Sequence, residues 1–181
     1  MGKLVFGMNV SLDGYVDGLS GNLEMPPPSP QLFDYWIDNI RSQAGTIYGR
    51  RMYEVMRYWD KDDPEWTEPR RSFADAWRKL PKWVVSQTLR TVGPNATLIA
   101  HDIETQVRSI KTRTEGTISV SGPQLAGLIT KLGLIDGYHL YVAPYVLGQG
   151  KPFFHGARPQ LRLVSSELVD DATVHLTYVS A

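Results

Sequence analysis

The chain has 181 residues, of which 42% are hydrophobic and 21% charged, and its 19 basic residues balance 19 acidic ones. A chain without excess positive charge gives no electrostatic reason to expect binding to nucleic acid or to an anionic membrane surface. The absence of cysteine excludes disulfide bonds, thiolate nucleophiles and cysteine-ligated zinc, and it is compatible with the reducing cytoplasm in which we expect the protein.

The spacing of apolar residues predicts the secondary structure, because strands repeat every two residues and helices about every 3.6. In chain order the expected elements are strand 3–10, helix 31–43, strand 44–48, a helix from 50, helix 70–79, strand 83–85, strand 97–100, helix 103–111, strand 117–120, helix 123–132, and strands 138–146, 161–169 and 174–179. The loop from 17 to 30 is rich in glycine and proline and longer than most connections, which is typical of a functional lid.

The order of these elements predicts the fold class. Strands alternate with helices over most of the chain, and this pattern favours a parallel sheet. The last three strands have only short connections marked by glycine or aspartate, so we expect them to add antiparallel strands to one edge. We therefore expect one domain, 1–181, with an α/β fold in which helices cover both faces of a mixed, mainly parallel sheet.

Residues that suit a dinucleotide follow three of the predicted strands. Gly49-Arg50-Arg51 opens a helix, whose first N–H groups and positive dipole end attract phosphate. Ser86-Gln87-Thr88 and Ser121-Gly122-Pro123-Gln124 follow two further strands, and neighbouring parallel strands form one ligand crevice at their carboxyl ends. Arginines in place of an acidic residue favour NADP over NAD. Taken singly, each motif is equally explained as a helix cap or a turn.

The order of the motifs along the chain carries a family resemblance. The motifs are Met-Asn-Val-Ser-Leu-Asp-Gly at 8–14, Gly-Arg-x-x-Tyr-Glu at 49–54, Ser-x-Thr at 86–88, Ser-Gly-Pro-x-Leu-Ala at 121–126, and Gly-Leu-Ile-Asp-x-Tyr…Pro-x-Val-Leu-Gly-x-Gly-x-Pro-Phe-Phe at 133–154. Together they resemble the dihydrofolate reductase-like superfamily. Within it, the chain most resembles the C-terminal reductase domain of the bifunctional riboflavin-biosynthesis deaminase/reductase and its stand-alone relatives. The resemblance implies a three-layer dihydrofolate reductase-like fold and an NADPH-dependent reductase.

The resemblance also implies which residues bind NADPH. The implied contacts are the adenosine-side phosphates for Gly49, Arg50 and Arg51, the 2′-phosphate region for Ser86 and Thr88, the pyrophosphate for Ser121, Gly122, Gln124 and Leu125, and the nicotinamide for Val10. The chain departs from the family's usual pattern at two positions. Met52 replaces a frequent threonine and removes a hydroxyl that could touch phosphate, and Ser121 replaces a glycine and adds a side chain where glycine permits close approach.

Two aspartates are candidates for a catalytic proton donor, a role that suits a carboxylate with a raised pKa. Asp34 lies on the helix after the long loop, where dihydrofolate reductases place an acid, about one residue out of register. Its neighbours Asp38 and Arg41 equally indicate a solvated helix face. Asp13 is the second candidate, although an aspartate before Gly14 is also typical of a tight turn.

Aromatic and glycine residues are candidates for substrate contacts. Tyr35 and Trp59 could stack on a flat heterocycle, and aromatic residues at helical spacing equally indicate core packing. Gly148 and Gly150 could cradle a substrate phosphate or form a hairpin-type turn. The four histidines show no metal-ligand spacing, so we expect no metal site.

Two functions are compatible with these patterns. The first is an NADPH-dependent reductase that acts on a small heterocyclic or sugar-phosphate substrate, similar to 5-amino-6-(5-phosphoribosylamino)uracil reductase of riboflavin biosynthesis or to dihydrofolate reductase. The alternative is a non-catalytic protein that binds a nucleotide or small ligand on the same fold. We also expect a homodimer, because the apolar stretch 140–147 is expected near the sheet edge and the family that the chain resembles is commonly dimeric.

Overall fold

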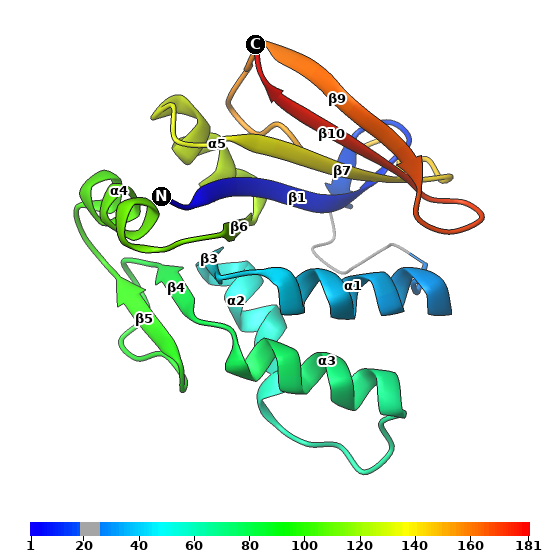
Figure 1. Cartoon of the computed structure of the whole chain (residues 1–181), viewed down its shortest axis with the longest axis horizontal. Helices are drawn as coiled ribbons and strands as arrows, with labels where there is room; N and C mark the ends of the chain where they lie inside the picture. The colour runs from blue at the N-terminus through cyan, green and yellow to red at the C-terminus, as the bar shows by residue number, and fades with distance from the viewer. Residues whose placement is uncertain (19–25) are drawn as a thin grey trace.

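The structure, a computed structural model, describes residues 1–18 and 26–181. Its main sheet contains eight strands in the order β5-β4-β3-β6-β1-β7-β10-β9 (Figure 1). Their bounds are β1 Lys3–Ser11, β3 Gly45–Gly49, β4 Lys82–Val85, β5 Ala96–Ile99, β6 Thr117–Ser121, β7 Gly137–Ala143, β9 Leu161–Leu168 and β10 Val174–Ser180. The strands from β5 to β7 pair in parallel, whereas β10 pairs antiparallel with both β7 and β9. The predicted fold class is therefore confirmed.

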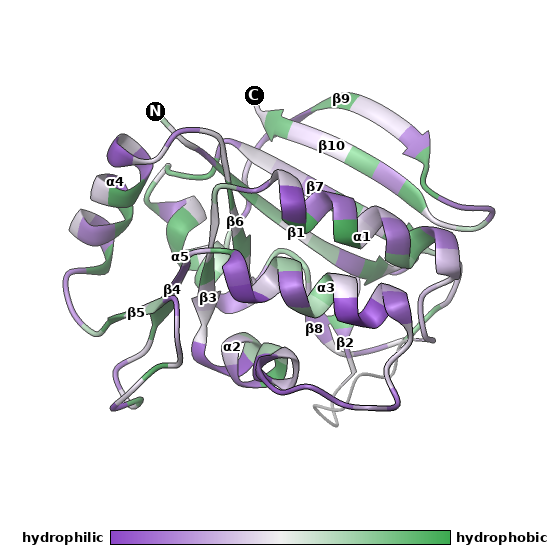
Figure 2. Cartoon of the chain, turned by 60° about the horizontal axis from the view of Figure 1, so that its bottom comes forward, coloured by the Kyte–Doolittle hydropathy of each residue, from purple (hydrophilic) through white to green (hydrophobic). Residues whose placement is uncertain are grey.

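Helices cover both faces of the main sheet. Their bounds are α1 Pro30–Ser42, α2 Arg50–Met56, α3 Glu68–Lys79, α4 Ile103–Arg113 and α5 Pro123–Lys131, with a short 3₁₀ helix, η1, at Arg57–Asp60. On one face, α4 and α5 contribute to a hydrophobic core that includes Phe6, Ile118 and Val120 of the sheet. On the other face, α1 and α3 run side by side (Figure 1). Hydrophobic and hydrophilic residues alternate around both helices, as an amphipathic helix on a sheet requires (Figure 2).

The sheet face under α1 and α3 carries more polar groups than the face under α4 and α5. Paired residues of neighbouring strands point to the same face, so the register places Asn9 beside Tyr141. The ring of Tyr141 lies edge-on to Trp36 of α1, with 4.3 Å between the ring centroids. Tyr48 of β3 accepts a hydrogen bond from Nε1 of Trp77 in α3 at 3.0 Å. These contacts attach both helices to the polar face of the sheet.

The first helix begins at Pro30, one residue before the predicted start, because Ser29 caps it. Oγ of Ser29 accepts a hydrogen bond from the N–H of Leu32 at 3.1 Å, and proline in the first turn needs no N–H. Ser29 also donates to Asp170 in the turn between β9 and β10, and this hydrogen bond is the main cause that lowers the pKa of Asp170 to about 2. The amino end of α1 is thus fixed to the antiparallel edge of the sheet.

The strand predicted at 138–146 needs correction, because β7 ends at Ala143. Pro144 cannot donate a ladder hydrogen bond, and the chain turns there with the N–H of Tyr145 bonded to the oxygen of Ala143. The stretch 140–147 is also not at the sheet edge. Its strand lies between β1 and β10, and β9 forms the edge instead.

The loop predicted to be a lid is described only in part. Residues 19–25 lie outside the described residues, and Asp17, where the lid was expected to start, is the last residue of strand β2 (Tyr15–Asp17). This strand pairs with β8 (Lys151–Pro152) in a small second sheet, which the sequence did not predict. Within the described part of the chain, no helix has the length and apolar character needed to cross a lipid bilayer.

Candidate functional site

The three strand ends that carry the predicted dinucleotide motifs lie next to one another. Strands β4, β3 and β6 are neighbours in the sheet. Gly49 at the end of β3 pairs with Val85 at the end of β4, and the preceding Tyr48 pairs with Ser121 at the end of β6. The three motifs therefore meet at the carboxyl edge of the sheet, which is where open α/β sheets bind ligands.

Two of these motifs open helices whose first turns lie side by side. A Cβ added to Gly49, before α2, would lie 3.7 Å from the Cβ of Leu125 in α5. One added to Gly122, before α5, would lie 3.9 Å from the Cβ of Met52 in α2. Gly122 has a φ of 107°, a backbone angle that residues other than glycine rarely adopt, so this turn requires glycine. Neither helix receives a side-chain cap from the described residues, so both present first-turn N–H groups to an anion.

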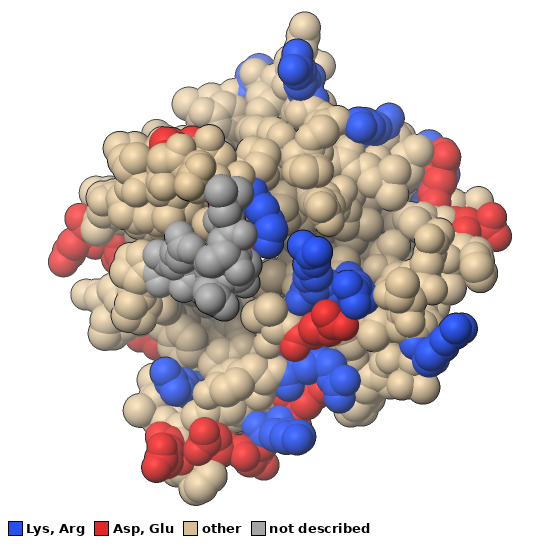
Figure 3. All heavy atoms as spheres, turned by 180° about the vertical axis from the view of Figure 1, so that it is seen from behind, with Lys and Arg blue, Asp and Glu red and all other residues tan. Residues whose placement is uncertain are grey.

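Arginine side chains add positive charge to these helix ends. Arg50 and Arg51 are exposed at the first two positions of α2. Arg50 lies 3.7 Å from Glu54, and both side chains are 45% exposed, so turning Arg50 toward a ligand costs little. Lys and Arg side chains gather near the centre of one face of the molecule (Figure 3). Helix ends without caps, a required glycine and two arginines fit the phosphate groups of NADPH.

The other residues predicted to bind the cofactor differ in how far their side chains are buried. Ser86 is buried, and its Oγ accepts hydrogen bonds at 3.2 and 3.0 Å from two backbone N–H groups of the following turn, including that of Thr88. Val10 is 1% exposed and Leu125 is 7% exposed, so their side chains pack mainly in the core. Thr88 and Gln124 are exposed. The cofactor contacts of these residues stay predictions.

Asp13 and Gly148, which the sequence suggested for separate roles, contact each other. The Asp13 carboxylate accepts hydrogen bonds from Oγ of Ser11 at 2.6 Å, from the N–H of Leu147 at 3.1 Å and from the N–H of Gly148 at 2.7 Å. The hydrogen bond from Ser11 is the main cause that lowers the pKa of Asp13. These contacts favour the ionised carboxylate, which is the wrong form for a proton donor. Asp13 therefore fastens the 144–148 loop to the end of β1.

Gly150 has a structural explanation in the small sheet. A Cβ added at this position would lie 2.1 Å from the backbone oxygen of Asp17, so a side chain would force β8 away from β2. Lys151, next along the chain, forms an ion pair with Asp17 at 3.1 Å. Backbone contact between the two strands accounts for glycine here, and a contact of Gly150 with substrate phosphate stays a prediction.

Replacing Asp13 by alanine is expected to release the 144–148 loop. The N–H groups of Leu147 and Gly148 would lose their acceptor, so they should exchange faster with deuterium, and the loop should become more sensitive to protease. Hydrogen exchange followed by mass spectrometry tests this on the wild type and D13A. The control is Asp38→Ala on α1, where the aspartate side chain is 83% exposed. Unchanged exchange in the loop of D13A would contradict the role assigned to this carboxylate.

The residues of α1 and η1 that were predicted to act on or contact substrate differ in their surroundings. Asp34 is exposed on α1, and its role as proton donor stays a prediction. The hydroxyl of Tyr35 lies 3.1 Å from the hydroxyl of Tyr141, so this side chain is held against β7. Trp59 packs on Phe73 of α3 with 4.7 Å between ring centroids, in the cluster that joins α1, α3 and η1. The surroundings of Trp59 are those of a packing residue.

The sequence analysis missed a polar network on β7, β10 and β9. Nδ1 of His175 lies 3.0 Å from a carboxylate oxygen of Glu167, and its Nε2 lies 3.0 Å from Nδ1 of His139. The ring of Tyr141 stacks on His175 with 4.4 Å between centroids. Burial lowers the pKa of His139 to about 4 and raises the pKa of Tyr141. Alternation along each strand could place these residues on one face, but it could not predict which strands pair.

The lowered pKa of His139 predicts that stability depends on pH. The folded protein keeps His139 neutral while the unfolded chain binds a proton, so stability should fall as the pH drops from 6.5 toward about 4. From pH 7 to pH 5 the expected loss is about 1–2 kcal/mol, with partial exposure taken into account. Urea unfolding at both pH values should show a weaker pH dependence for H139Q, and an unaltered one for the control H101Q at an exposed histidine. Equal pH dependence of the wild type and H139Q would contradict the assignment of this stability loss to His139.

One protein-family model covers the strands and motifs described above. The family model for the RibD C-terminal domain matches residues 2–175. The chain belongs to the RibD C-terminal domain family. The match begins just before β1 and ends within β10, so all three strand-end motifs of this RibD-type domain lie inside it. The resemblance inferred from the motifs is thereby confirmed.

Similar proteins extend over nearly the whole RibD-type domain. The uncharacterized protein YyaP of Bacillus subtilis (strain 168) is 27% identical over 97% of this chain and 94% of its own length. The crystal structure of a putative riboflavin biosynthesis protein from Shewanella sp. PV-4 has a TM-score of 0.72 at 21% identity and covers 100% of this chain and 99% of that chain. Dihydrofolate reductase from Enterococcus faecalis, complexed with NADP(H), has a TM-score of 0.67 at 15% identity. The match covers 98% of this chain and 96% of that chain. At these identities the two structures show the shared fold alone.

Proposed function

We propose that this RibD-type domain is an NADPH-dependent reductase that transfers a hydride to a small heterocyclic or sugar-phosphate substrate. The observation that carries the proposal is the pair of uncapped helix ends, α2 and α5, beside Arg50 and Arg51 at the carboxyl edge of the sheet. Membership of the RibD C-terminal domain family supports a reductase, and the fold is shared with a dihydrofolate reductase complexed with NADP(H). When bound, NADPH supplies the hydride.

The chain's own residues bind and orient the cofactor in this proposal. The first N–H groups of α2 and α5 bind phosphate oxygens, while Gly49 and Gly122 let the backbone approach them. Arg50 and Arg51 add the charge that favours the 2′-phosphorylated cofactor. The end of β1, on the other side of β6 from β3, then lies next to the reacting rings. Asp34 on α1 is the candidate proton donor.

Titration of the protein with NADPH, NADP and NADH, followed by fluorescence and thermal unfolding, tests the cofactor. NADPH should bind at least about tenfold more tightly than NADH and should raise the melting temperature. Lack of stabilisation by any of the three at millimolar concentration would refute the proposal. Binding of NADPH without its consumption in the presence of pyrimidine, pterin and quinone candidates would favour the non-catalytic alternative.

The proposed assembly is a homodimer formed through β9. All residues from 162 to 168 are exposed, and within the described part of the chain no strand pairs with the outer edge of β9. Leu163, Val164 and Leu168 are 50%, 54% and 70% exposed. An exposed edge strand with apolar side chains is suited to pairing with a second copy, which would cover these groups.

Sedimentation at micromolar concentration should therefore give about twice the chain mass of 20.4 kDa. The double variant Val164→Asp and Leu168→Asp places charges in the proposed interface and should sediment as a monomer. Its affinity for NADPH should not change, because the candidate cofactor site is on other strands. A monomeric wild type would contradict the assembly.

A further inference from the structure

Asn9 places a polar side chain between two apolar residues of β1, Met8 and Val10. Val10 belongs to the main hydrophobic core and Met8 packs against it, so Asn9 points to the opposite face, where Tyr141 of β7 is its neighbour. Two residues later, β1 ends at Ser11, on the carboxyl edge of the sheet. Oδ1 of Asn9 is buried and has no hydrogen-bond partner among the residues that the structure describes.

Two polar residues beside Asn9, Ser11 of the same strand and Tyr141 across the pair, already have partners. The hydroxyl of Ser11 donates to Asp13 at 2.6 Å and accepts a backbone N–H at 3.0 Å. The hydroxyl of Tyr141 lies 3.1 Å from that of Tyr35. The single proton of the Ser11 hydroxyl is used in the hydrogen bond to Asp13, so Ser11 cannot donate to Asn9, and the hydroxyl of Tyr141 contacts Tyr35 instead. A buried amide oxygen without a partner costs free energy, and a donor on a ligand removes that cost.

The surroundings of Asn9 indicate the shape of such a ligand. Trp36 of α1 lies edge-on to Tyr141 and is only partly buried, so it presents aromatic surface above this end of the sheet. Ligand sites commonly combine such an apolar surface with a few polar groups that fix orientation. Aromatic rings also favour stacked or edge-on contact with a second ring. A planar ring with a polar edge suits this combination.

We infer that Asn9 determines substrate specificity by accepting a hydrogen bond from the ring N–H of a planar heterocycle. The inference rests on the proposed reductase function, because it puts the substrate at the end of β1, beside the strands proposed to bind the cofactor. The amide of Asn9 also offers an NH₂ donor, so its best match is a ring edge with an N–H next to a carbonyl, as in a cyclic amide. Methylation of the ring nitrogen removes the donor.

Two probes that differ only in ring methylation test this role. 5,6-Diaminouracil carries ring N–H groups beside carbonyls, and 5,6-diamino-1,3-dimethyluracil carries none. Calorimetric titration, with and without NADP, should show that the wild type binds the first about tenfold more tightly. Asn9→Leu should bind both within about twofold. The control Asn39→Leu, on α1, changes an asparagine that is bonded to Gln43 and should keep the wild-type ratio.

Thermal unfolding separates recognition from a purely structural role. Asn9→Leu removes no side-chain hydrogen bond to the residues that the structure describes, so its melting temperature should equal or exceed that of the wild type. Asn9 does not act as inferred if the wild type fails to distinguish the probes or binds neither at millimolar concentration. The same holds if Asn9→Leu keeps the distinction or unfolds at a clearly lower temperature. Failure of the proposed reductase function would show itself differently, as absence of NADPH binding to the wild type.

Discussion

Alanine in place of Gly127 is expected to destabilise the protein by about 2–4 kcal/mol or to prevent folding. Gly127 lies inside α5, where glycine itself costs about 1 kcal/mol relative to alanine. A close contact explains why glycine occupies this position, because an added Cβ would lie 1.9 Å from the backbone oxygen of His155. Backbone cannot move aside as a flexible side chain can, so α5 would have to shift away from the segment that contains His155.

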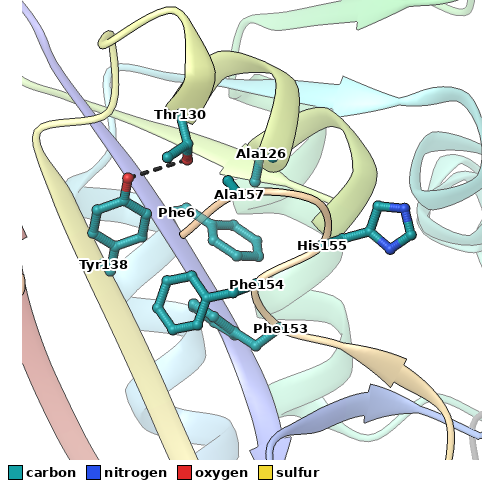
Figure 4. Close-up of a pocket in the computed structure, with 9 residues that line it drawn as sticks. Phe6, Ala126, Thr130, Tyr138, Phe153, Phe154, His155 and Ala157 are labelled. Atoms are coloured by element: carbon teal, nitrogen blue, oxygen red, sulfur yellow. Dashed lines mark hydrogen bonds between the residues drawn. The ribbon is translucent and has the colours of Figure 1, made fainter. Parts of the chain in front are cut away.

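The packing around this contact shows why the shift would be costly. Phe6 of β1 and Phe153 lie with ring centroids 4.2 Å apart beneath α5. The hydroxyl of Tyr138 donates to Oγ1 of Thr130 in α5 at 3.1 Å (Figure 4). All of these groups pack around α5, and the first turn of this helix belongs to the candidate cofactor site. Loosening this packing should therefore weaken cofactor binding as well as stability.

Urea unfolding of the wild type and G127A measures the effect directly. Gly49→Ala is the matched control, because among the described residues an added Cβ there meets only the Cβ of Leu125, at 3.7 Å, and φ is −74°. The control should change the free energy of unfolding by less than about 1 kcal/mol. A G127A protein as stable as this control would contradict the contact between α5 and His155.

Glutamine at both Arg50 and Arg51 should weaken NADPH binding by about 10- to 100-fold and NADH binding by less than about threefold. The two arginines are exposed, so their loss removes charge from the helix end without disturbing the core. NADPH carries an additional phosphate, which is the group that the charge is proposed to bind. For the same reason, the affinity of the wild type for NADPH should fall as salt concentration rises.

Fluorescence titration of both cofactors separates this effect from general loss of binding. The control variant carries Arg41→Gln on α1 and Arg71→Gln on α3, whose side chains are 54% and 52% exposed in the wild type. It should bind both cofactors as the wild type does. An equal loss for NADPH and NADH in the Arg50 and Arg51 variant would show that these residues do not bind the 2′-phosphate.

The sequence predicted those features of the fold that depend on local pattern. The helix at 103–113 and the strand at 117–121 follow the periodicity of their apolar residues, and the structure places them within two residues of the predicted bounds. The position of each dinucleotide motif at a strand end was predictable because each motif follows directly after its strand. Only the adjacency of β4, β3 and β6 had to come from the structure.

Features that depend on contacts between distant residues were not predictable. Asp13 and Gly148 are separated by 135 positions, and the sequence suggested a catalytic acid for one and an anion cradle for the other. In the structure these two residues are the partners of one hydrogen bond. The edge position expected for 140–147 was wrong because hydrophobicity does not distinguish a strand inside the sheet from one at its edge. A polar residue amid the apolar residues of β1 was a readable signal for Asn9, but only packing shows that its oxygen has no partner among the described residues.

Amide hydrogen exchange of the wild type, with and without NADPH, tests the proposed cofactor crevice most directly. Bound NADPH should slow exchange at 49–52 and 121–125, the first turns of α2 and α5, because their N–H groups would then donate to phosphate. Exchange in β9, at the far edge of the sheet, should not change in the same experiment. Saturation with NADPH that leaves exchange at both helix ends unaltered would contradict a cofactor site at this edge of the sheet.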